Sequence, residues 1–243
     1  MNTKRQLSRY LGSLILPLGL FNLSSSATDP ESGFTAGLAA RDRGHFATAF
    51  RTWMPLANEG FAEAQNNIGH MYETGQGVTR SFTEAMRWYR LAADAELPQA
   101  QHNLGLLYFH GYGVPADKSE AVTWFTLAAE QNLAESQYML GVVHQQGDGA
   151  DLDYAEARRR FRQSSLNGYA DAQLMYAYML QAGEGGEPDP FHAYIWARIA
   201  QHHGQPGALD LIGVAVLLLN RNDLSRAETL LTACLADGLH TCP

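Results

Sequence analysis

Basic residues are scarce in this chain of 243 residues, which has 17 Lys and Arg residues against 25 Asp and Glu residues. Three of the basic residues, Lys4, Arg5 and Arg9, lie within the first 27 positions, where no acidic residue occurs. From residue 28 onward, 14 basic residues therefore face 25 acidic ones, which gives a net charge of −11. Such a surface repels phosphate, so we expect no binding to nucleic acid or to an anionic membrane surface through a basic face.

The hydrophobic run near the N-terminus is too short to cross a bilayer comfortably. It extends over Leu11–Phe21, contains Pro17, follows the basic residues and precedes small residues up to Ala27. These are the three parts of a secretory signal peptide. We therefore expect residues 1–27 to be removed near Ala27, leaving a soluble periplasmic or secreted protein without an integral membrane segment; the alternative is a permanent transmembrane helix.

Cysteine is nearly absent, because only Cys234 and Cys242 occur, both close to the C-terminus. No cysteine lies near Ser25, so a lipid anchor is not expected there. In an oxidising compartment the pair can form a disulfide between the last helix and the tail after it; the alternative is two unrelated thiols. A Cys-x7-Cys spacing without histidines at ligand spacing is a poor metal or redox signature.

Sequence motifs of catalysis are missing as well. The chain has no Gly-x-Ser-x-Gly elbow, no phosphate loop ending in Gly-Lys-Ser/Thr, and no His-Glu-x-x-His or Cys/His cluster. Four of the histidines are spread over different segments: His70, His102, His110 and His144. The adjacent His202 and His203 would point about 100° apart on a helix and could not hold one ion from one face. We therefore expect no metal, no cofactor and no catalytic residue.

What the chain has instead is a period of 36 residues. Glutamine recurs at positions 65, 101, 137 and 173, and glycine at 69, 105 and 141, with Ala177 in the fourth row. Gly-x-Gly pairs begin at positions 75, 111, 147 and 183. Tryptophan recurs at 88, 124 and 196, with Arg160 as the one exception. Chance does not align so many columns, so the pattern predicts a repeat protein.

Each row of 36 residues predicts two helices. In the first, helix A, Ala64, Ile68 and Met71 form an apolar stripe at helical spacing, and the Gly-x-Gly pair ends the helix after about 12 residues. Helix B begins at a column of capping residues, three of which are followed by Glu three positions later as in a capping box: Ser81, Asp117, Asp153 and finally Asp189. The Gly-x-Gly pairs follow helices and not strands, so they are helix ends and not nucleotide cradles.

The pattern predicts one all-α domain over residues 28–243 with six helical pairs. Four repeats occupy residues 61–96, 97–132, 133–168 and 169–204. Shorter turns mark an N-terminal pair, residues 34–60, and a C-terminal pair, residues 205–238, whose helices we expect at 206–219 and 223–237. We expect both terminal pairs to cover the open ends of the stack.

The repeat unit has a recognisable register. Ala-Gln-x-x-(Leu/Ile)-Gly-x-x-Tyr-x-x-Gly-x-Gly, followed by Glu-Ala-x-x-Trp-(Tyr/Phe)-x-x-Ala-Ala, occurs at residues 64–93 and 100–129. It resembles the Sel-one-like repeat (SLR), a relative of the tetratricopeptide repeat (TPR), over residues 61–204. The third and fourth copies depart from it at His144, Arg160, Leu180 and Ala197. The resemblance implies a right-handed α-solenoid whose concave face binds partner proteins, often in assemblies of the bacterial envelope.

The resemblance also supplies an enzymatic alternative. A cysteine-rich branch of the same family has been linked to β-lactam binding and hydrolysis, so a hydrolase acting on β-lactam or cell-wall substrates is the rival hypothesis. Members of that branch staple each repeat with a cysteine pair. This chain has no cysteine between residues 28 and 233, which removes most of the support for the rival.

Two columns of helix A lie outside its packing stripe, and in superhelical repeats helix A lines the concave face. The columns are Asn67, Asn103, Met139 and Met175, and His70, Leu106, Val142 and Tyr178. We expect these residues to bind a partner segment, chiefly through the apolar members in the third and fourth repeats, because methionine adapts to varied peptides. The alternative is that the superhelix buries them against a neighbouring turn or the last helices.

Helix B of the third repeat concentrates basic charge in an otherwise acidic chain, at Arg158, Arg159, Arg160 and Arg162. A docking spot for an acidic partner, an ion-pair patch and, more commonly, a solvated helix face all account for such a cluster. Taken together, the sequence predicts an exported, non-enzymatic adaptor or scaffold that binds other proteins of the cell envelope. A purely structural link between envelope components is the remaining alternative.

Overall fold

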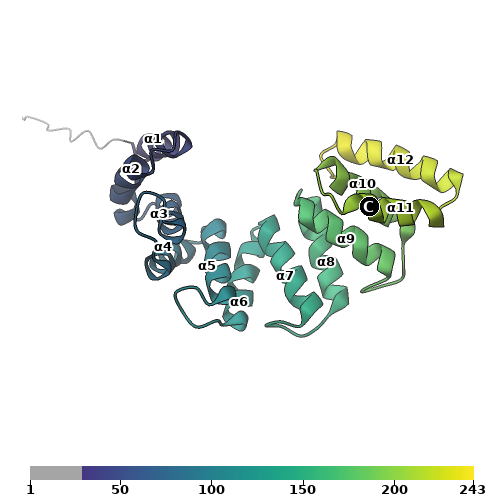
Figure 1. Ribbon diagram of the computed structural model, residues 1–243, viewed down its shortest axis with the longest axis horizontal. Helices are drawn as coiled ribbons and strands as arrows, with labels where there is room; N and C mark the ends of the chain where they lie inside the picture. The colour runs from purple at the N-terminus through teal and green to yellow at the C-terminus, as the bar shows by residue number, and fades with distance from the viewer. Residues whose placement is uncertain (1–28) are drawn as a thin grey trace, which may run out of the picture.

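The computed structural model describes residues 29–243; the expected signal peptide at residues 1–27 lies outside this part of the chain. The described residues form twelve α-helices and no strand (Figure 1). The helices are α1 (Pro30–Asp42), α2 (Phe46–Asn58), α3 (Ala62–Thr74), α4 (Phe82–Asp94), α5 (Pro98–His110), α6 (Lys118–Glu130), α7 (Ala134–Gln146), α8 (Tyr154–Leu166), α9 (Ala170–Ala182), α10 (Pro190–His202), α11 (Ala208–Leu218) and α12 (Arg221–Ala236). The prediction of an all-α solenoid of helical pairs is confirmed.

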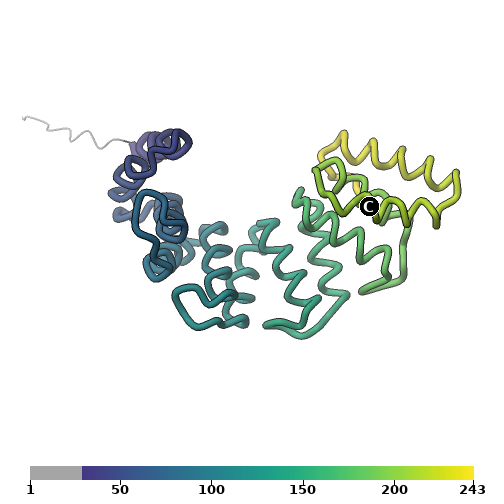
Figure 2. The backbone as a smooth tube through the Cα atoms, in the orientation of Figure 1, coloured from purple at the N-terminus to yellow at the C-terminus, as the bar shows by residue number. Residues whose placement is uncertain are grey.

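The helices follow one another along an arc, with α1 and α2 at one tip and α11 and α12 at the other (Figure 1). Each helix from α2 to α10 packs on the helix before it and the helix after it. The loops between α5 and α6 and between α7 and α8 lie on the outer edge of this arc (Figure 2). Because neighbours in sequence are neighbours in space, the hydrophobic core is drawn out along the arc and not gathered at one centre.

The Gly-x-Gly pair performs two separate tasks at the end of each helix A. Gly111 adopts a left-handed backbone with φ of 73° and ends α5, a conformation that costs glycine little because it lacks a Cβ. Gly113 lies against the start of α4 in the preceding repeat, where a Cβ would come within 2.9 Å of the Phe82 backbone. The first glycine therefore stops the helix, and the second brings two repeats together.

Helix B begins at the predicted cap residues in all four repeats. The side chains of Ser81, Asp117, Asp153 and Asp189 each accept a hydrogen bond from the backbone N–H three residues later. The expected return bond of the capping box is not formed, because the N–H of each cap residue donates to a helix A carbonyl instead: Tyr72, Tyr108, His144 and Leu180. The glutamate at the third position is therefore free to bond elsewhere.

The glycine in the middle of helix A makes room for an aromatic ring of helix B. A Cβ on Gly69, Gly105 or Gly141 would lie 2.7 Å from the ring of Tyr89, Phe125 or Phe161, respectively. All three rings are fully buried. The fourth repeat has Ala177 and Ala197 at the equivalent positions, so its alanine faces no such ring. Two departures from the repeat pattern thus compensate for each other.

A buried glutamine column connects successive repeats. In every repeat its Nε2 donates to the carbonyl eight residues earlier, at 3.0 to 3.4 Å: Gln65 to Ala57, Gln101 to Ala93, Gln137 to Ala129 and Gln173 to Ser165. Its Oε1 is met by a side chain thirty residues later: Gln131 for Gln101, Asn167 for Gln137 and His203 for Gln173. In the first repeat that position is Ala95, and the buried Oε1 of Gln65 has no partner among the described residues.

The two ends of the arc are built differently. The N-terminal helices α1 and α2 pack as a pair, with α1 beginning at Pro30, four residues before the expected position. The C-terminal helices do not pack as the expected pair, because α11 lies on α9 and α10 while α12 lies on α10. The inner stripe of α12, formed by Ala227, Leu231 and Cys234, supplies the apolar surface for that contact.

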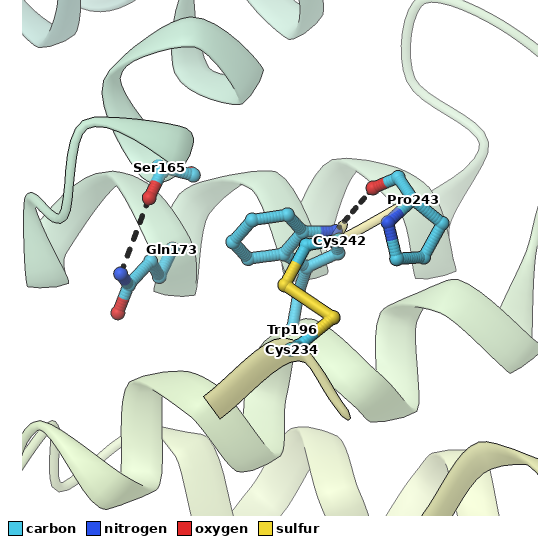
Figure 3. The surroundings of a disulfide bond; sticks show 6 residues. All are labelled: Ser165, Gln173, Trp196, Cys234, Cys242 and Pro243. Carbon is cyan, nitrogen blue, oxygen red and sulfur yellow. Dashed lines mark hydrogen bonds between the residues drawn. A yellow bond between two sulfur atoms is a disulfide. The ribbon is translucent and has the colours of Figure 1, made fainter. Parts of the chain in front are cut away.

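The C-terminal tail folds back over the fourth repeat. A disulfide joins Cys234 of α12 to Cys242, and the carbonyl of Pro243 accepts a hydrogen bond of 3.0 Å from Nε1 of Trp196 (Figure 3). Trp196 is fully buried on α10. The covalent link therefore holds the end of the chain over a tryptophan of the repeat core.

Candidate functional site

The structure divides the predicted partner-binding residues between exposed and half-buried positions. His70 and Tyr178 are exposed, and the remaining six are half-buried: Asn67, Asn103, Leu106, Met139, Val142 and Met175. Val142 and Met175 pack against the core of the fourth repeat, while Leu106 and Met139 pack around Phe125. Tyr178 is thus the exposed apolar member of the set, and an open apolar groove does not run through the third and fourth repeats.

A polar groove lies at the other end of the same surface. One hollow of about 290 Å³ is bordered by Asn66, Asn67, His70, Gln99, His102, Asn103, Leu133 and Glu135. A second hollow of about 320 Å³ is bordered by Phe34, Leu38, Glu63, Asn66, Asn67, Leu97 and Gln99. The two share three residues, so they form one groove across α1, α3, α5 and the start of α7. We call it the amide groove.

Sequence reasoning found part of the amide groove and missed the rest. Asn67, His70 and Asn103 were expected on this surface, and all three border it. Asn66 and His102 share one column, immediately before that of Asn67, while Glu63, Gln99 and Glu135 form a column one helical turn earlier. Residues one turn apart share a helix face, so the earlier column could have been included from spacing alone.

The groove offers hydrogen-bonding groups of both kinds. Asn103 Nδ2 donates to Asn66 Oδ1 at 3.0 Å, which joins two repeats across the floor. Burial lowers the pKa of His102 to about 4, so its imidazole is neutral near pH 7, and its Nδ1 lies 2.9 Å from Ser136 Oγ. Amides and a neutral imidazole can both donate and accept, which suits an uncharged polar ligand such as a peptide backbone.

Charge is distributed unevenly between the two helix layers. Helices α3, α5, α7 and α9 contain no lysine or arginine, while the exposed carboxylates Glu63 and Glu135 border the amide groove. The arginines of the four repeats lie on the B helices and in loops instead. The charge at the groove therefore suits a neutral or basic segment better than an acidic one.

The arginines of α8 are mostly engaged with their own neighbours. Arg159 and Arg160 both bond to Glu156, with Nε to carboxylate distances of 2.7 Å, and these bonds, that of Arg159 foremost, lower the pKa of Glu156 to about 2. Arg158 donates to the carbonyl of Glu187 at 3.3 Å. Arg159 and Arg160 therefore form an ion-pair patch, which is one of the explanations that the sequence offered for this basic cluster. Arg162 remains an exposed residue.

Arg160 also explains how the third repeat functions without its tryptophan. In the second repeat, Trp124 Nε1 donates to Glu120 Oε1 at 2.8 Å. Arg160 Nε donates to Glu156 in the same way, from the equivalent position to the equivalent glutamate. The repeat therefore keeps an N–H donor for the glutamate that the capping geometry leaves free.

Neither a metal-binding cluster nor a membrane-spanning helix is found within residues 29–243. In that range no group of three or more His, Cys, Asp or Glu side chains is placed to hold a metal ion. None of the helices in the described part of the chain combines the length and the hydrophobicity needed to cross a bilayer.

Comparison with known proteins places these features in a family. The Sel1 repeat model matches four consecutive segments, residues 62–97, 98–133, 134–169 and 170–200. These boundaries fall one residue after those predicted from the period, except at the end of the last. No curated protein has a sequence that matches this chain.

Solved structures agree with the assignment. A Sel1 repeat protein from Oxalobacter formigenes is 29% identical, with a TM-score of 0.68 and 74% of each chain covered. The protective antigen c5321 of uropathogenic Escherichia coli, which displays an SLR fold, is 27% identical with a TM-score of 0.68; the match covers 88% of this chain and 51% of the antigen. A putative Sel1 repeat protein from Klebsiella pneumoniae shares the fold at 19% identity and a TM-score of 0.53, over 80% of this chain and 97% of its own. With four matched repeats over more than half of its length, the chain belongs to the Sel1 repeat family.

Proposed function

We propose that the chain is an exported, non-catalytic scaffold that binds an extended, neutral or basic segment of a partner protein in the amide groove. Sel1 repeat proteins are generally protein-interaction scaffolds, which supports the general class of function. The observation that carries the specific proposal is the continuous groove across α1, α3, α5 and α7, with amides on its floor and carboxylates at its rim. An extended segment has unpaired backbone N–H and C=O groups, and asparagine side chains can satisfy both.

Export is supported by two features of the chain and by one relative. Residues 1–27 have the composition of a signal peptide. The disulfide between Cys234 and Cys242 suits an oxidising compartment. The related E. coli protein is a protective antigen, which agrees with a location outside the cytoplasm. Sequencing the N-terminus of protein from the periplasmic fraction tests this part, because a chain that keeps residues 1–27 and stays in the cytoplasm would contradict export.

The groove is tested by photo-crosslinking in intact cells. A photoreactive residue at His70, which is exposed at the groove, should capture the partner, whereas the same residue at Thr83, exposed on α4, should not. The partner identified in this way then allows a binding measurement. Asn67→Arg should abolish binding because it fills the groove and repels a basic segment, while Thr83→Arg serves as the matched control.

The groove variant should not disturb the fold, because no side-chain hydrogen bond among the described residues involves Asn67 and its side chain is half-buried. Unchanged helical circular dichroism would establish this. If the partner binds Asn67→Arg as tightly as the unaltered protein, the groove is not its site. Turnover of a β-lactam or cell-wall substrate by the purified protein would contradict the non-catalytic part of the proposal.

A further inference from the structure

Helix α11 is apolar around almost its whole circumference, and Asp210 is its one charged residue. Its inner side, with Ala208 and Ala215 fully buried, packs on α9 and α10. Its outer side leaves five large apolar side chains exposed: Leu209 at 61%, Val214 at 45%, Val216 at 41%, Leu217 at 85% and Leu218 at 61%. A helix that is apolar on all sides is ordinarily buried on all sides. The exposed half of α11 therefore lacks a covering partner among residues 29–243.

The position of α11 makes this exposure unusual. The terminal helices of a solenoid normally present a polar outer face, because no further repeat covers them. The expected cap at residues 205–238 does not do so, since α12 packs on α10 and leaves the outer side of α11 open. Helices α11 and α12 lie at this tip of the arc (Figure 1). An apolar surface at the end of a stack suits another helix better than water.

The distribution of charge favours α11 of a second copy of the same chain as the helix that covers this surface. Residues 28–243 carry a net charge of −11, so two copies repel each other through most of their surface. Helix α11 has no basic residue and one acidic residue, Asp210, which lies one turn before Gly213 on the same side. Two copies that meet on α11 therefore bring few like charges together. Gly213 lies on its outer side, where nothing stands within 4 Å of a Cβ, and this allows a second helix to approach closely.

A hollow beside α11 supplies complementary shape. It has a volume of about 250 Å³ and lies between α9 and α11, bordered by Tyr178, Gln181, Ala182, Leu211, Val214 and Leu218. Leucine side chains from a facing α11 are of the size and polarity to enter it. Tyr178, which the sequence placed on the partner-binding face, therefore belongs to this surface and not to the amide groove.

We propose that α11 packs against α11 of a second copy across a two-fold axis that passes near Gly213 and Leu217. Each contact is then made twice, as in any isologous interface. The proposal goes beyond partner binding in the amide groove, whose helices α1, α3 and α5 lie toward the other tip of the arc (Figure 1).

The available area fits a weak dimer. One fully exposed aliphatic side chain corresponds to about 100 Å² of apolar surface, so the five α11 side chains offer about 300 Å² per copy. Tyr178 of α9, which borders the hollow beside α11 and is partly exposed, raises the total to about 340 Å². A small stable interface buries about 800 Å² per partner, of which about 60% is apolar. The patch therefore supplies most of what such a dimer needs, and we expect dissociation in the micromolar range.

Sedimentation of residues 28–243, which contain all twelve helices, tests the proposal between about 1 μM and about 1 mM protein. We expect a monomer–dimer equilibrium that Leu217→Glu weakens at least about a hundredfold, because the substitution places two charges in one two-fold interface. Leu127→Glu, at an exposed leucine of α6, is the control and should leave the equilibrium unchanged. Leu217 is 85% exposed, so its replacement should not affect the fold of one copy, which circular dichroism checks.

A cross-linking experiment locates the axis independently. Both native cysteines are in the disulfide, so Leu217→Cys introduces one reactive thiol per chain. A short bismaleimide should join two such chains and should not join two Leu127→Cys chains. A protein that is monomeric at every concentration, a dimer unaffected by Leu217→Glu, or a dimer that Leu217→Cys fails to cross-link would overturn the proposal. So would flotation of a monomer with phosphatidylcholine–phosphatidylglycerol vesicles, since α11 would then face lipid.

Discussion

The second and fourth repeats have the same two helices but hold them together with different side chains. In the second, Gly105 lies beneath the ring of Phe125; in the fourth, Ala177 and Ala197 occupy the two positions. Both arrangements keep helix A and helix B in contact. The comparison shows that the repeat requires complementary volumes at this contact and not a particular residue.

Buried polar groups are likewise satisfied by different residues in the two repeats. The buried Oε1 of Gln101 is met by Gln131, and that of Gln173 by His203 at 2.7 Å. The indole N–H of Trp124 donates to Glu120 in its own helix, whereas that of Trp196 donates to Pro243 at the end of the chain. A buried polar atom needs a partner, and residues far apart in sequence can supply it equally well.

The largest expected difference between the second and fourth repeats is in their stability toward acid. Burial lowers the pKa of His102 from 6.5 to about 4, whereas the equivalent position in the fourth repeat is Leu174. The unfolded chain therefore binds a proton between pH 6.5 and 4 that the folded chain does not, so stability is lost as the pH falls through this window. The loss amounts to about 3 kcal/mol. Urea unfolding at pH 7 and pH 4 measures it.

His102→Asn is the control for this prediction, because asparagine does not titrate. On acidification, the free energy of unfolding of the variant should fall by about 3 kcal/mol less than that of the unaltered chain. Hydrogen exchange should show an acid-sensitive opening in α5 that His102→Asn removes. An equal pH dependence of the two proteins would mean that His102 is not the group responsible.

Gly105→Ala should be the next largest effect. The new Cβ would lie 2.7 Å from the ring of Phe125, which costs about 3 kcal/mol of packing strain, while alanine returns about 1 kcal/mol through its helix propensity. We expect a net loss of about 2 kcal/mol in the free energy of unfolding. Ala177→Gly in the fourth repeat should cost only about 1 kcal/mol through propensity. If Gly105→Ala stabilises the protein, the ring does not require the glycine.

The glutamine column distinguishes the first repeat from the second. Gln101 bonds to both Ala93 and Gln131, whereas Gln65 bonds to Ala57 alone. Replacement by alanine should therefore cost about 2 kcal/mol at Gln101 and about 1 kcal/mol at Gln65. Denaturant unfolding of both variants measures the difference, and equal losses would remove the role assigned to Gln131.

Ala95→Gln should supply the bond that the first repeat lacks. The new amide can reach the unpartnered Oε1 of Gln65, as Gln131 reaches Gln101, and should stabilise the chain by about 1 kcal/mol. The same substitution in a Gln65→Leu background should bring no gain, because the acceptor is then missing. If the substitution stabilises both backgrounds, its effect comes from the end of α4 and not from a bond to Gln65.

Much of the fold was predictable because its signals are local. Glycines that end helix A and cap residues that begin helix B act within one helical turn, so their positions fix the ends of the helices directly. The capping boxes were predicted only in part, since Ser81 and its equivalents donate their N–H to the preceding helix A. That bond joins two helices, so the spacing of residues within one helix does not predict it.

The site was less predictable for the same reason. Asn67 and Asn103 border the groove, whereas Met139 and Val142, at equivalent columns in the third repeat, pack against apolar neighbours instead. The burial of Val142 depends on the core of the fourth repeat, and the covering of Met139 on residues around Phe125. Equivalent positions in a repeat share a backbone but not the same neighbours.

The sequence by itself determined that the chain is a stack of helical pairs, because a 36-residue period, helix ends and apolar stripes depend on residues one or two turns apart. Only the tertiary structure decided which outward-facing columns stay open, why His102 is neutral, and that the rest of residues 29–243 leave the outer side of α11 uncovered. Burial is set by the atoms that surround a side chain, and in this protein those atoms come from other repeats and from the last two helices.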